Sequence, residues 1–548
     1  MTPPTSAAWC LWPLCLLLFA CNPAANSASA DPEAHLVPLP APLLLRRLSL
    51  DLRGVLPSVA QLDAVEADPD TLATYREQYL TDPRLEDRLV AMLGERWHTR
   101  VDAFDIRHYD YKLDDRDEFA FEQAVGEEPL RLMAHVVMTE APWTEIVTAD
   151  YTMANEMLAD LWPIAYPTDG SGWRQSTYTD GRPAVGVLAT NGLWWRYVTS
   201  TFNLSRSRVA AASRLLTCYD ILERPISFSA TPALLDEDGT AAAIQGEDAC
   251  VACHATIEPA ASAMFGFVPV VSHNVDEVET YHPEREPLGE PTLGVSSAWY
   301  GTPIDGLSEL GPAIAADPRF TTCAVETFAT ALWRRPTEPA DDARLEALRV
   351  HFVAEELHVR ALIREILQGP TWQAGGLDAT ADEETVLRER TRRLLSPDQL
   401  QSAIEDLTGF RWTENGFDQL QNDERGFRVL AGGVNGVNVL RPQQDPGLTW
   451  TVTTERLAQA AASTVVDNDL GGGTPRLLTV SGDARPGDAA FDDQIRALTW
   501  QLHARRATDA EVGAWAGLWT AVEATDGALS AWKAVLAVMF RDPAFVAT

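Results

Sequence analysis

Near the middle of the chain stand Cys250-Val251-Ala252-Cys253-His254, the single C-x-x-C-H pattern in the sequence. This spacing is typical of c-type haem attachment, in which two thiols form thioethers with one porphyrin and the adjacent histidine lies under the iron. The alternative is a buried cysteine pair, or a redox C-x-x-C, beside an incidental histidine. A zinc site would need a second ligand pair at a suitable spacing, and none follows. We therefore expect one covalent haem c, bound by Cys250 and Cys253, with His254 as the proximal ligand of its iron.

The N-terminus predicts export, which covalent haem attachment requires in bacteria. Residues 1–20 carry no charged side chain and include an apolar run, Leu14–Ala20, that suits a signal peptide and is too short to span a bilayer. The run leads into Leu18-Phe19-Ala20-Cys21, which resembles a bacterial lipobox, although the usual Lys or Arg before it is missing. We expect a lipid on Cys21 that anchors the exported protein to a membrane, in the periplasm or at the cell surface. An ordinary signal peptide with an accidental cysteine is the alternative.

Composition and charge indicate a globular, acidic protein. The chain has 548 residues, 46% of them hydrophobic, and its 17 Trp and 17 Phe provide material for large cores. A formal net charge of −36 argues against nucleic acid as a partner, because nucleic-acid binding is driven by cationic surface. The same charge favours cationic partners, although acidity that serves only solubility explains most of the surface equally well.

The remaining cysteines predict one disulfide. Of the 7 cysteines, Cys10 and Cys15 leave with the signal peptide, and three others have a lipid or a haem to bind. Cys218 and Cys323 remain, one on each side of the haem motif. Because thiols left over in an oxidising compartment usually pair, we expect a bridge between them. Two separately buried thiols are the alternative.

A weak internal repeat predicts small helical modules. In each copy a basic residue or pair precedes a helix start, and an apolar helix later ends before an x-Pro segment. The copies run from Arg53 to Asp82-Pro83, from Arg334-Arg335 to Gly369-Pro370 and from Arg505-Arg506 to Asp542-Pro543, and a fourth start follows Arg392-Arg393. Three starts are capping boxes, in which two side chains satisfy free helix amides: Ser58/Gln61, Ser396/Gln399 and Thr508/Glu511. Duplication and convergence on good capping chemistry both explain the pattern.

Helical periodicity dominates the rest of the chain, so we expect a mainly α protein. It would be a multi-module helical scaffold in which a long loop-rich segment, 265–312, wraps one covalent haem. The predicted division is a signal peptide (1–20), a lipid-proximal linker (21–40), an N-terminal helical module (41–130), a central helical module (131–245), a cytochrome c haem-binding module (246–372), a linker (373–390) and a C-terminal helical module (391–548).

Several further segments carry a family resemblance. They are the run Arg46–Gly54 with Leu56-Pro57, the run Thr144–Asn155, the extension Ala255–Pro259 of the haem motif, and the pairs Asp305-Gly306 and Glu309-Leu310. In this order they resemble the planctomycete-type cytochrome c proteins, which are large exported multi-module proteins of unknown function with one haem motif in a mostly helical frame. The resemblance implies haem and export, and it implies that Cys323 lies in the helix after the motif with Cys218 as its upstream partner. It supplies no reaction.

The other contacts of the iron stay open. We expect a backbone carbonyl near Pro259 to hold the second ring nitrogen of His254. Met264 is a candidate for the sixth ligand because it lies close to the motif in sequence. A helix that starts at the motif would carry Met264 away from the far face of the haem, and core packing is the competing interpretation. His273 and His282 lie in the segment 265–312 and either reach back to the iron or stay at the surface. An iron without a sixth protein ligand would favour small-ligand chemistry over pure electron transfer.

Two functional classes follow from these observations. The first is electron transfer, in which an anchored monohaem protein passes electrons to a redox partner protein. The second is a haem-dependent oxidoreductase that acts on a bound small molecule or carbohydrate. A structural surface lipoprotein with a vestigial haem is a third alternative. The chain contains no Gly-rich phosphate loop and no Gly-x-Ser-x-Gly elbow, so no catalytic residue is assigned.

Overall fold

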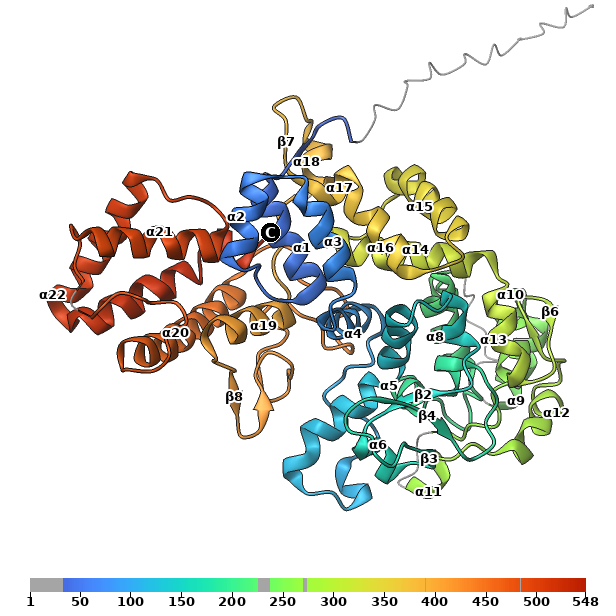
Figure 1. Ribbon diagram of the computed structural model, residues 1–548. Helices are drawn as coiled ribbons and strands as arrows, with labels where there is room; N and C mark the ends of the chain where they lie inside the picture. Colours follow the sequence, from blue (N-terminus) through green and yellow to red (C-terminus); the bar gives the residue numbers. More distant parts are fainter. Residues whose placement is uncertain (1–32, 225–236, 270–273, 390, 483) are drawn as a thin grey trace, which may run out of the picture.

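The computed structural model describes residues 33–224, 237–269, 274–389, 391–482 and 484–548 (Figure 1). The structure is 59% helix with few strands, which confirms that the protein is mainly α. No helix in these ranges is long and apolar enough to cross a membrane. The predicted signal peptide and Cys21 lie outside the described residues.

Three groups of helices repeat one order along the chain. The first group is α1 (Ala41–Arg53), α2 (Val59–Ala67) and α3 (Thr71–Leu80), followed by α4 (Arg84–Trp97). The second is α14 (Pro318–Trp333), α15 (Asp342–Ala354) and α16 (Val359–Gln368), followed by α17 (Pro370–Gln373). The third is α21 (Ala489–His503) and α22 (Asp509–Met539), which is broken at Gly527, followed by α23 (Pro543–Val546). The repeat in the sequence therefore corresponds to a three-helix unit that ends at an x-Pro helix start.

The turn after the first helix has the same construction in each group. The first helix ends at a residue with left-handed backbone, which lets the chain leave the helix sharply. These residues are Gly54 (φ 73°), Arg334 (φ 56°) and Ala504 (φ 52°). A capping box then opens the next helical segment, at Ser58/Gln61, Glu338/Asp341 and Thr508/Glu511, and another opens α19 (Pro397–Thr408) at Ser396/Gln399. The three capping boxes predicted from the sequence are confirmed.

Buried arginines in α1 join the groups to one another. Arg46 donates hydrogen bonds of 2.5 and 2.8 Å to two carbonyls at the end of α23. Arg47 donates bonds of 2.5 and 2.7 Å to two carbonyls at the end of α17. Helix carboxyl ends carry partial negative charge and carbonyls that the helix itself leaves unpaired, so each guanidinium supplies donors to such groups. Because both arginines belong to α1, this helix holds the second and third groups in place.

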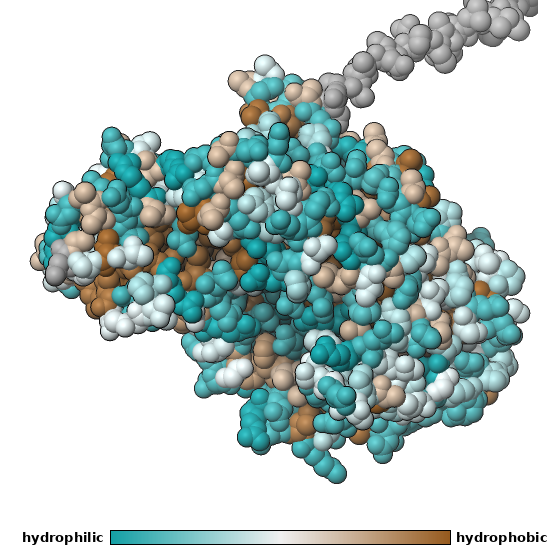
Figure 2. Space-filling model, in the orientation of Figure 1, coloured by the Kyte–Doolittle hydropathy of each residue, from teal (hydrophilic) through white to brown (hydrophobic). Residues whose placement is uncertain are grey.

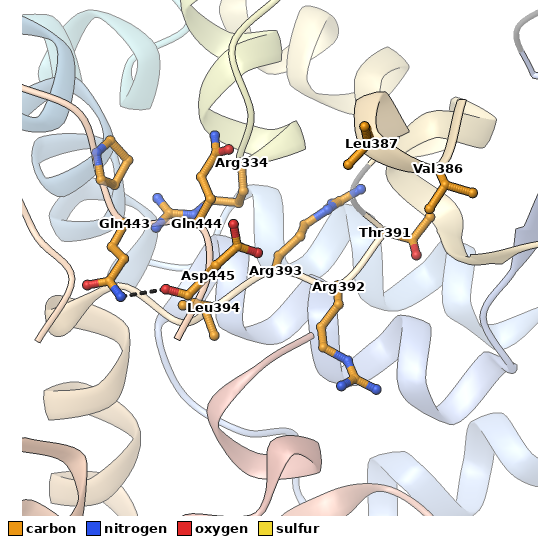
Figure 3. Close-up of a pocket in the computed structure, with 11 residues that line it drawn as sticks. Arg334, Val386, Leu387, Thr391, Arg392, Arg393, Leu394, Gln443, Gln444 and Asp445 are labelled. Carbon is orange, nitrogen blue, oxygen red and sulfur yellow. Dashed lines mark hydrogen bonds between the residues drawn. The ribbon is translucent and has the colours of Figure 1, made fainter. Parts of the chain in front are cut away.

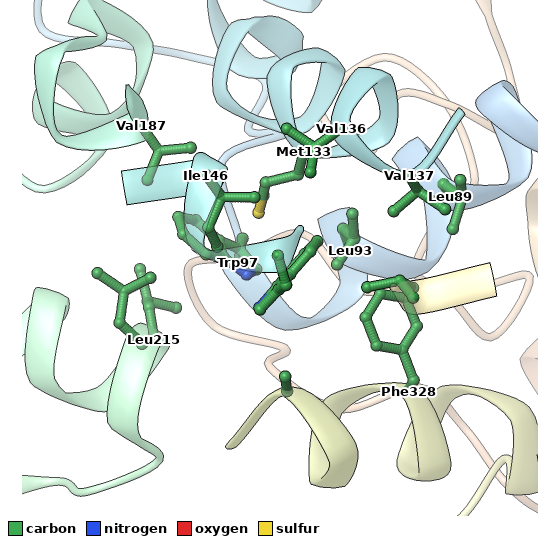
Figure 4. Close-up of a cluster of buried hydrophobic side chains, with 14 of the residues drawn as sticks. Leu89, Leu93, Trp97, Met133, Val136, Val137, Ile146, Val187, Leu215 and Phe328 are labelled. Atoms are coloured by element: carbon green, nitrogen blue, oxygen red, sulfur yellow. The ribbon is translucent and has the colours of Figure 1, made fainter. Parts of the chain in front are cut away.

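One large core joins the first two groups to the central part of the chain. Its side chains come from α4, α5 (Glu118–Met138), α8 (Arg206–Thr217) and α14, and they include Trp97, Met133, Leu215 and Phe328 (Figure 4). A second core fills the C-terminal part and takes in Leu50 from α1. The predicted N-terminal, central and haem modules thus all contribute to the large core and to a smaller cluster around Phe121, Trp162 and Trp195, and the boundary predicted after residue 130 falls inside α5.

Short elements complete the central and haem-motif regions. A three-stranded antiparallel sheet has the order β2-β4-β3. The elements here are β2 (Thr152–Ala154), α6 (Glu156–Leu161), β3 (Ile164–Ala165), β4 (Arg174–Tyr178), α7 (Asn191–Arg196), α9 (Glu237–Gly246), α10 (Asp248–Ser262), α11 (Val275–Val278), α12 (Gly289–Leu293), β5 (Ala298–Trp299), β6 (Thr302–Pro303) and α13 (Leu307–Ala315). In the C-terminal part the remaining elements are β8 (Thr413–Glu414), β9 (Phe417–Asp418) and α20 (Leu448–Leu470).

The segment predicted as a linker, 373–390, carries regular structure where it is described. Strand β7 (Ala374–Leu377) pairs antiparallel with β1 (Leu36–Pro38), and α18 (Glu383–Glu389) follows. The Glu389 carboxylate is buried and forms ion pairs with Arg335 at 3.4 Å and Arg344 at 3.0 Å. Strand pairing and buried charge fix this segment against the second helical group, which a free linker would not show.

The visible surface is largely polar, as expected for a protein rich in charged side chains. The face in Figure 2 is largely hydrophilic, with apolar side chains gathered over the C-terminal helices α20–α22. Leu448 at the start of α20 is 81% exposed and Val452, one turn later, is 47% exposed.

Replacing Arg47 tests whether buried guanidinium groups hold the scaffold together. Arg47→Met keeps much of the side-chain volume but removes the two short bonds to the carbonyls of Trp372 and Ala374, which leaves Trp372 with the 3.3 Å bond from Arg393, so we expect a loss of about 2 kcal/mol in unfolding free energy. Urea titration of the purified protein measures the change. Arg349→Met is the matched control, because Arg349 forms an ion pair with Glu346 on the surface of α15, with no other ion pair among the described residues, and its loss should change little. Equal stability of both variants and the wild type would contradict the assignment.

Candidate functional site

The C-x-x-C-H motif occupies the first turns of α10. Cys250, Cys253 and His254 stand at positions i, i+3 and i+4 of this helix, a spacing that puts three side chains on one face. Cys253 is buried, whereas Cys250 is half-buried and the His254 side chain is 24% exposed. Neither cysteine is in a disulfide. The motif therefore presents two free thiols and one imidazole from a single helical face.

The imidazole of His254 is held by a carboxylate. Its Nδ1 lies 2.7 Å from Oε1 of Glu258, one helical turn further along α10. The prediction that a backbone carbonyl near Pro259 holds this nitrogen is wrong. The reason is that α10 continues through Pro259 to Ser262, so carbonyls there run along the helix axis, while a side chain four residues on shares the face of His254.

Glu258 is a buried, charged group with a second partner. It is 5% exposed, and its Oε1 also accepts a 2.6 Å bond from Nε of Arg206 in α8. Burial alone would raise the pKa of the Glu258 carboxyl, but hydrogen bonds from His254 and Arg206 outweigh burial and hold this pKa below its ordinary value. The carboxylate is therefore ionised at neutral pH. Its Oε2 is buried and has no hydrogen-bond partner among the described residues.

The start of the motif is also fastened to the segment after α8. Arg224 donates a 2.5 Å bond to the carbonyl of Ala252 and a 2.7 Å bond from Nε to the hydroxyl of Tyr219. Tyr219 follows Cys218, which the structure joins to Cys323 of α14 in a disulfide with Cα atoms 5.1 Å apart. The bridge thus ties the end of α8 to α14, next to the residues that contact the motif.

The three residues considered as sixth iron ligands have different positions. Met264 is fully buried in the large core, which agrees with core packing. Both ring nitrogens of His282 have partners within its own segment: Nε2 lies 2.9 Å from the carbonyl of Glu277, and Nδ1 lies 3.1 Å from the carboxylate of Glu284. His273 lies outside the described residues. Met264 is thus engaged in core packing, and both ring nitrogens of His282 already have partners.

The donor set of α10 fits a covalent haem. The two thiols are free to form thioethers, and the bond from Nδ1 to Glu258 leaves Nε2 of His254 for iron. No group of three His, Cys, Asp or Glu side chains suited to a bare metal ion occurs among the described residues.

A cavity of about 320 Å³ lies elsewhere, between the end of α18 and the loop 442–445 (Figure 3). Its lining includes Arg334, Arg392 and Arg393 and none of the motif residues. The guanidinium groups of Arg392 and Arg393 point in different directions in Figure 3, and that of Arg393 donates to the carbonyls of Leu332 and Thr371. The cavity thus has structural arginines in its wall and does not extend the site on α10.

Comparison with known proteins places the N-terminal part of the chain in a family context. Residues 44–164 match PSD4, a protein family of unknown function (DUF1592). This domain is found in planctomycete-type cytochrome c proteins. The matched range contains the runs Arg46–Gly54 and Thr144–Asn155 that carried the resemblance, but it ends before the C-x-x-C-H motif. No curated protein and no solved structure matches the chain significantly.

Glu258 was quoted only within the extension Ala255–Pro259 of the motif and was given no role, and Arg206 was not expected at the site. A carboxylate four residues after a motif histidine was a usable signal once the motif was placed on a helix. Arg206 had no such signal, because it reaches Glu258 from another helix, 52 residues earlier in the chain.

Removing the bridge between Cys218 and Cys323 should cost stability without removing the motif. The bridge closes a segment of 105 residues, so Cys218→Ser/Cys323→Ser should lose roughly 4–5 kcal/mol in the chain-entropy model. Thermal unfolding with and without reductant measures the effect, and a variant that lacks both cysteines should no longer respond to reductant. Ready alkylation of Cys218 and Cys323 in native, unreduced protein would contradict the bridge.

Proposed function

We propose that the protein is an exported c-type cytochrome with one haem that acts in electron transfer. The observation that supports this most is the arrangement on α10: two free thiols and an imidazole on one helical face, with Nδ1 of the imidazole already bonded to Glu258. Cys250 and Cys253 would hold the porphyrin through thioethers, and His254 would bind its iron through Nε2. Bound there, the haem supplies one-electron redox chemistry.

Side chains of this protein would orient the iron ligand and restrain the segments around it. Glu258 orients the His254 ring, and Arg206 in turn holds Glu258. Arg224 and the Cys218–Cys323 bridge limit movement of the segments around the motif. With a net charge of −36, the surface would attract a redox partner protein that presents cationic side chains, since charge complementarity speeds the encounter.

A second candidate is a haem-dependent oxidoreductase that acts on a small molecule or carbohydrate. The observation in its favour is that Met264 is packed in the core and both nitrogens of His282 have other partners, which favours an iron without either as a sixth ligand. Carbon monoxide distinguishes the candidates: an iron with an open position binds the gas, whereas an iron capped by protein ligands resists it.

Haem content tests the proposal directly. Protein made with a c-type maturation system should give about one haem per chain in the pyridine haemochrome assay. Cys250→Ser and Cys253→Ser should each leave one thioether or lose the haem, and His254→Ala should change the absorption spectrum. Cys218→Ser/Cys323→Ser is the control, because it removes two cysteines but leaves the motif intact. A value near zero haem per chain in the wild type would contradict the proposal.

We further propose that Cys21 carries a lipid and that the mature protein is anchored to a membrane at the periplasm or cell surface. The support is the sequence Leu18-Phe19-Ala20-Cys21 after an apolar run. Cys21→Ser should move the protein to the soluble exported fraction or block its maturation, as measured by detergent phase partitioning. Unchanged partitioning of Cys21→Ser would count against the anchor.

A further inference from the structure

We propose that Glu258 is a positioning residue that makes His254 a strongly electron-donating ligand and so lowers the reduction potential of the iron. This inference rests on the haem proposed above, and it concerns what the chain does to that haem. It goes beyond attachment, because attachment needs only the two thiols and the imidazole.

The hydrogen bond to Glu258 determines which ring nitrogen of His254 carries the proton. The 2.7 Å distance from Nδ1 to Oε1 of Glu258 is that of a charge-assisted hydrogen bond. When Nε2 binds iron, the single ring proton must be at Nδ1, where Glu258 accepts it. Both residues lie on α10, four positions apart, so the helix itself fixes their separation.

The acceptor of this hydrogen bond, the Glu258 carboxylate, is buried. Glu258 is 5% exposed, so water does not screen its interaction with the imidazole. Among the described residues its other partner besides His254 is the Arg206 guanidinium, whose Nε reaches the same Oε1 at 2.6 Å. Arg206 is held by bonds of 3.0 and 3.1 Å from Nη1 to two carbonyls in the segment before α8. The carboxylate is therefore locked in place while it faces the ring.

The Glu258 carboxylate would change how strongly His254 donates electrons to the iron. A fixed carboxylate draws the Nδ1 proton toward itself, and this raises the basicity of Nε2. A more basic ligand stabilises the oxidised iron, which carries more positive charge, over the reduced iron. Axial ligation and hydrogen bonds around it are the means by which a protein sets haem potential. Glu258 should therefore shift the equilibrium toward ferric haem.

Glu258→Gln tests this inference, because it keeps the shape of the side chain and removes the negative charge. In haem-loaded, full-length protein we expect at least a tenfold shift of the reduction equilibrium toward ferrous haem, which corresponds to about 59 mV for one electron. Spectroelectrochemical titration measures it. Asp248→Asn is the matched control: Asp248 is an exposed carboxylate on the same helix, and it should shift the potential far less. Equal potentials in wild type and Glu258→Gln, or an equal shift in both variants, would overturn the inference.

A haem-free measurement keeps the test independent of haem loading. In haem-free wild type, nitrogen NMR should find the His254 proton at Nδ1, and in Glu258→Leu, which removes the acceptor altogether, the ring should lose that preference. The same tautomer in both proteins would overturn the role of Glu258 even if the variant failed to load haem. Haem content of the wild type separately tests the proposed function, so the two ideas fail by different results.

Discussion

The arrangement of the helical groups depends on positive charge buried in α1. Arg46 and Arg47 are adjacent, yet their guanidinium groups reach the ends of two different helices that lie more than 300 residues further along the chain. Burial without partners would be costly for an arginine, and burial without donors would be costly for helix-end carbonyls. Here the guanidinium groups donate hydrogen bonds to the helix-end carbonyls, so both kinds of group gain a partner. A single helix therefore fixes both the second group, at α17, and the third group, at α23.

This scaffold gives the motif helix a defined environment. The large core includes Ile257 and Ala260 of α10 together with side chains of α4, α5 and α14. Ser262 near the end of α10 bonds to Ser297 at 2.7 Å, and Arg224 bonds to the carbonyl of Ala252 near its start. The polar link Arg206–Glu258–His254 then sets the direction of the one imidazole in the motif. In this account, packing places the helix and a charged network aims the ligand.

Local chemistry was predictable from the sequence, whereas long-range contacts were not. Ser58, Ser396 and Thr508 formed the capping boxes that their neighbours predicted, because such boxes depend only on residues three positions apart. The pairing of β7 with β1 and the burial of Glu389 had no local signal, since their partners are distant in sequence. The predicted domain boundary after residue 130 lies inside α5. At the site, a backbone carbonyl was expected to hold His254, although a helix was expected to start at the motif. In α10 the i+4 position is occupied by Glu258, and helical geometry decides the partner.

The most direct test of the account is the chemical state of Cys250 and Cys253 in mature protein made with a c-type maturation system. Mass spectrometry of the peptide that contains residues 250–254 should find one haem added and both thiols blocked to alkylation. A peptide of unmodified mass, with Cys250 and Cys253 both open to alkylation, would contradict the central claim that this helix carries a covalent haem.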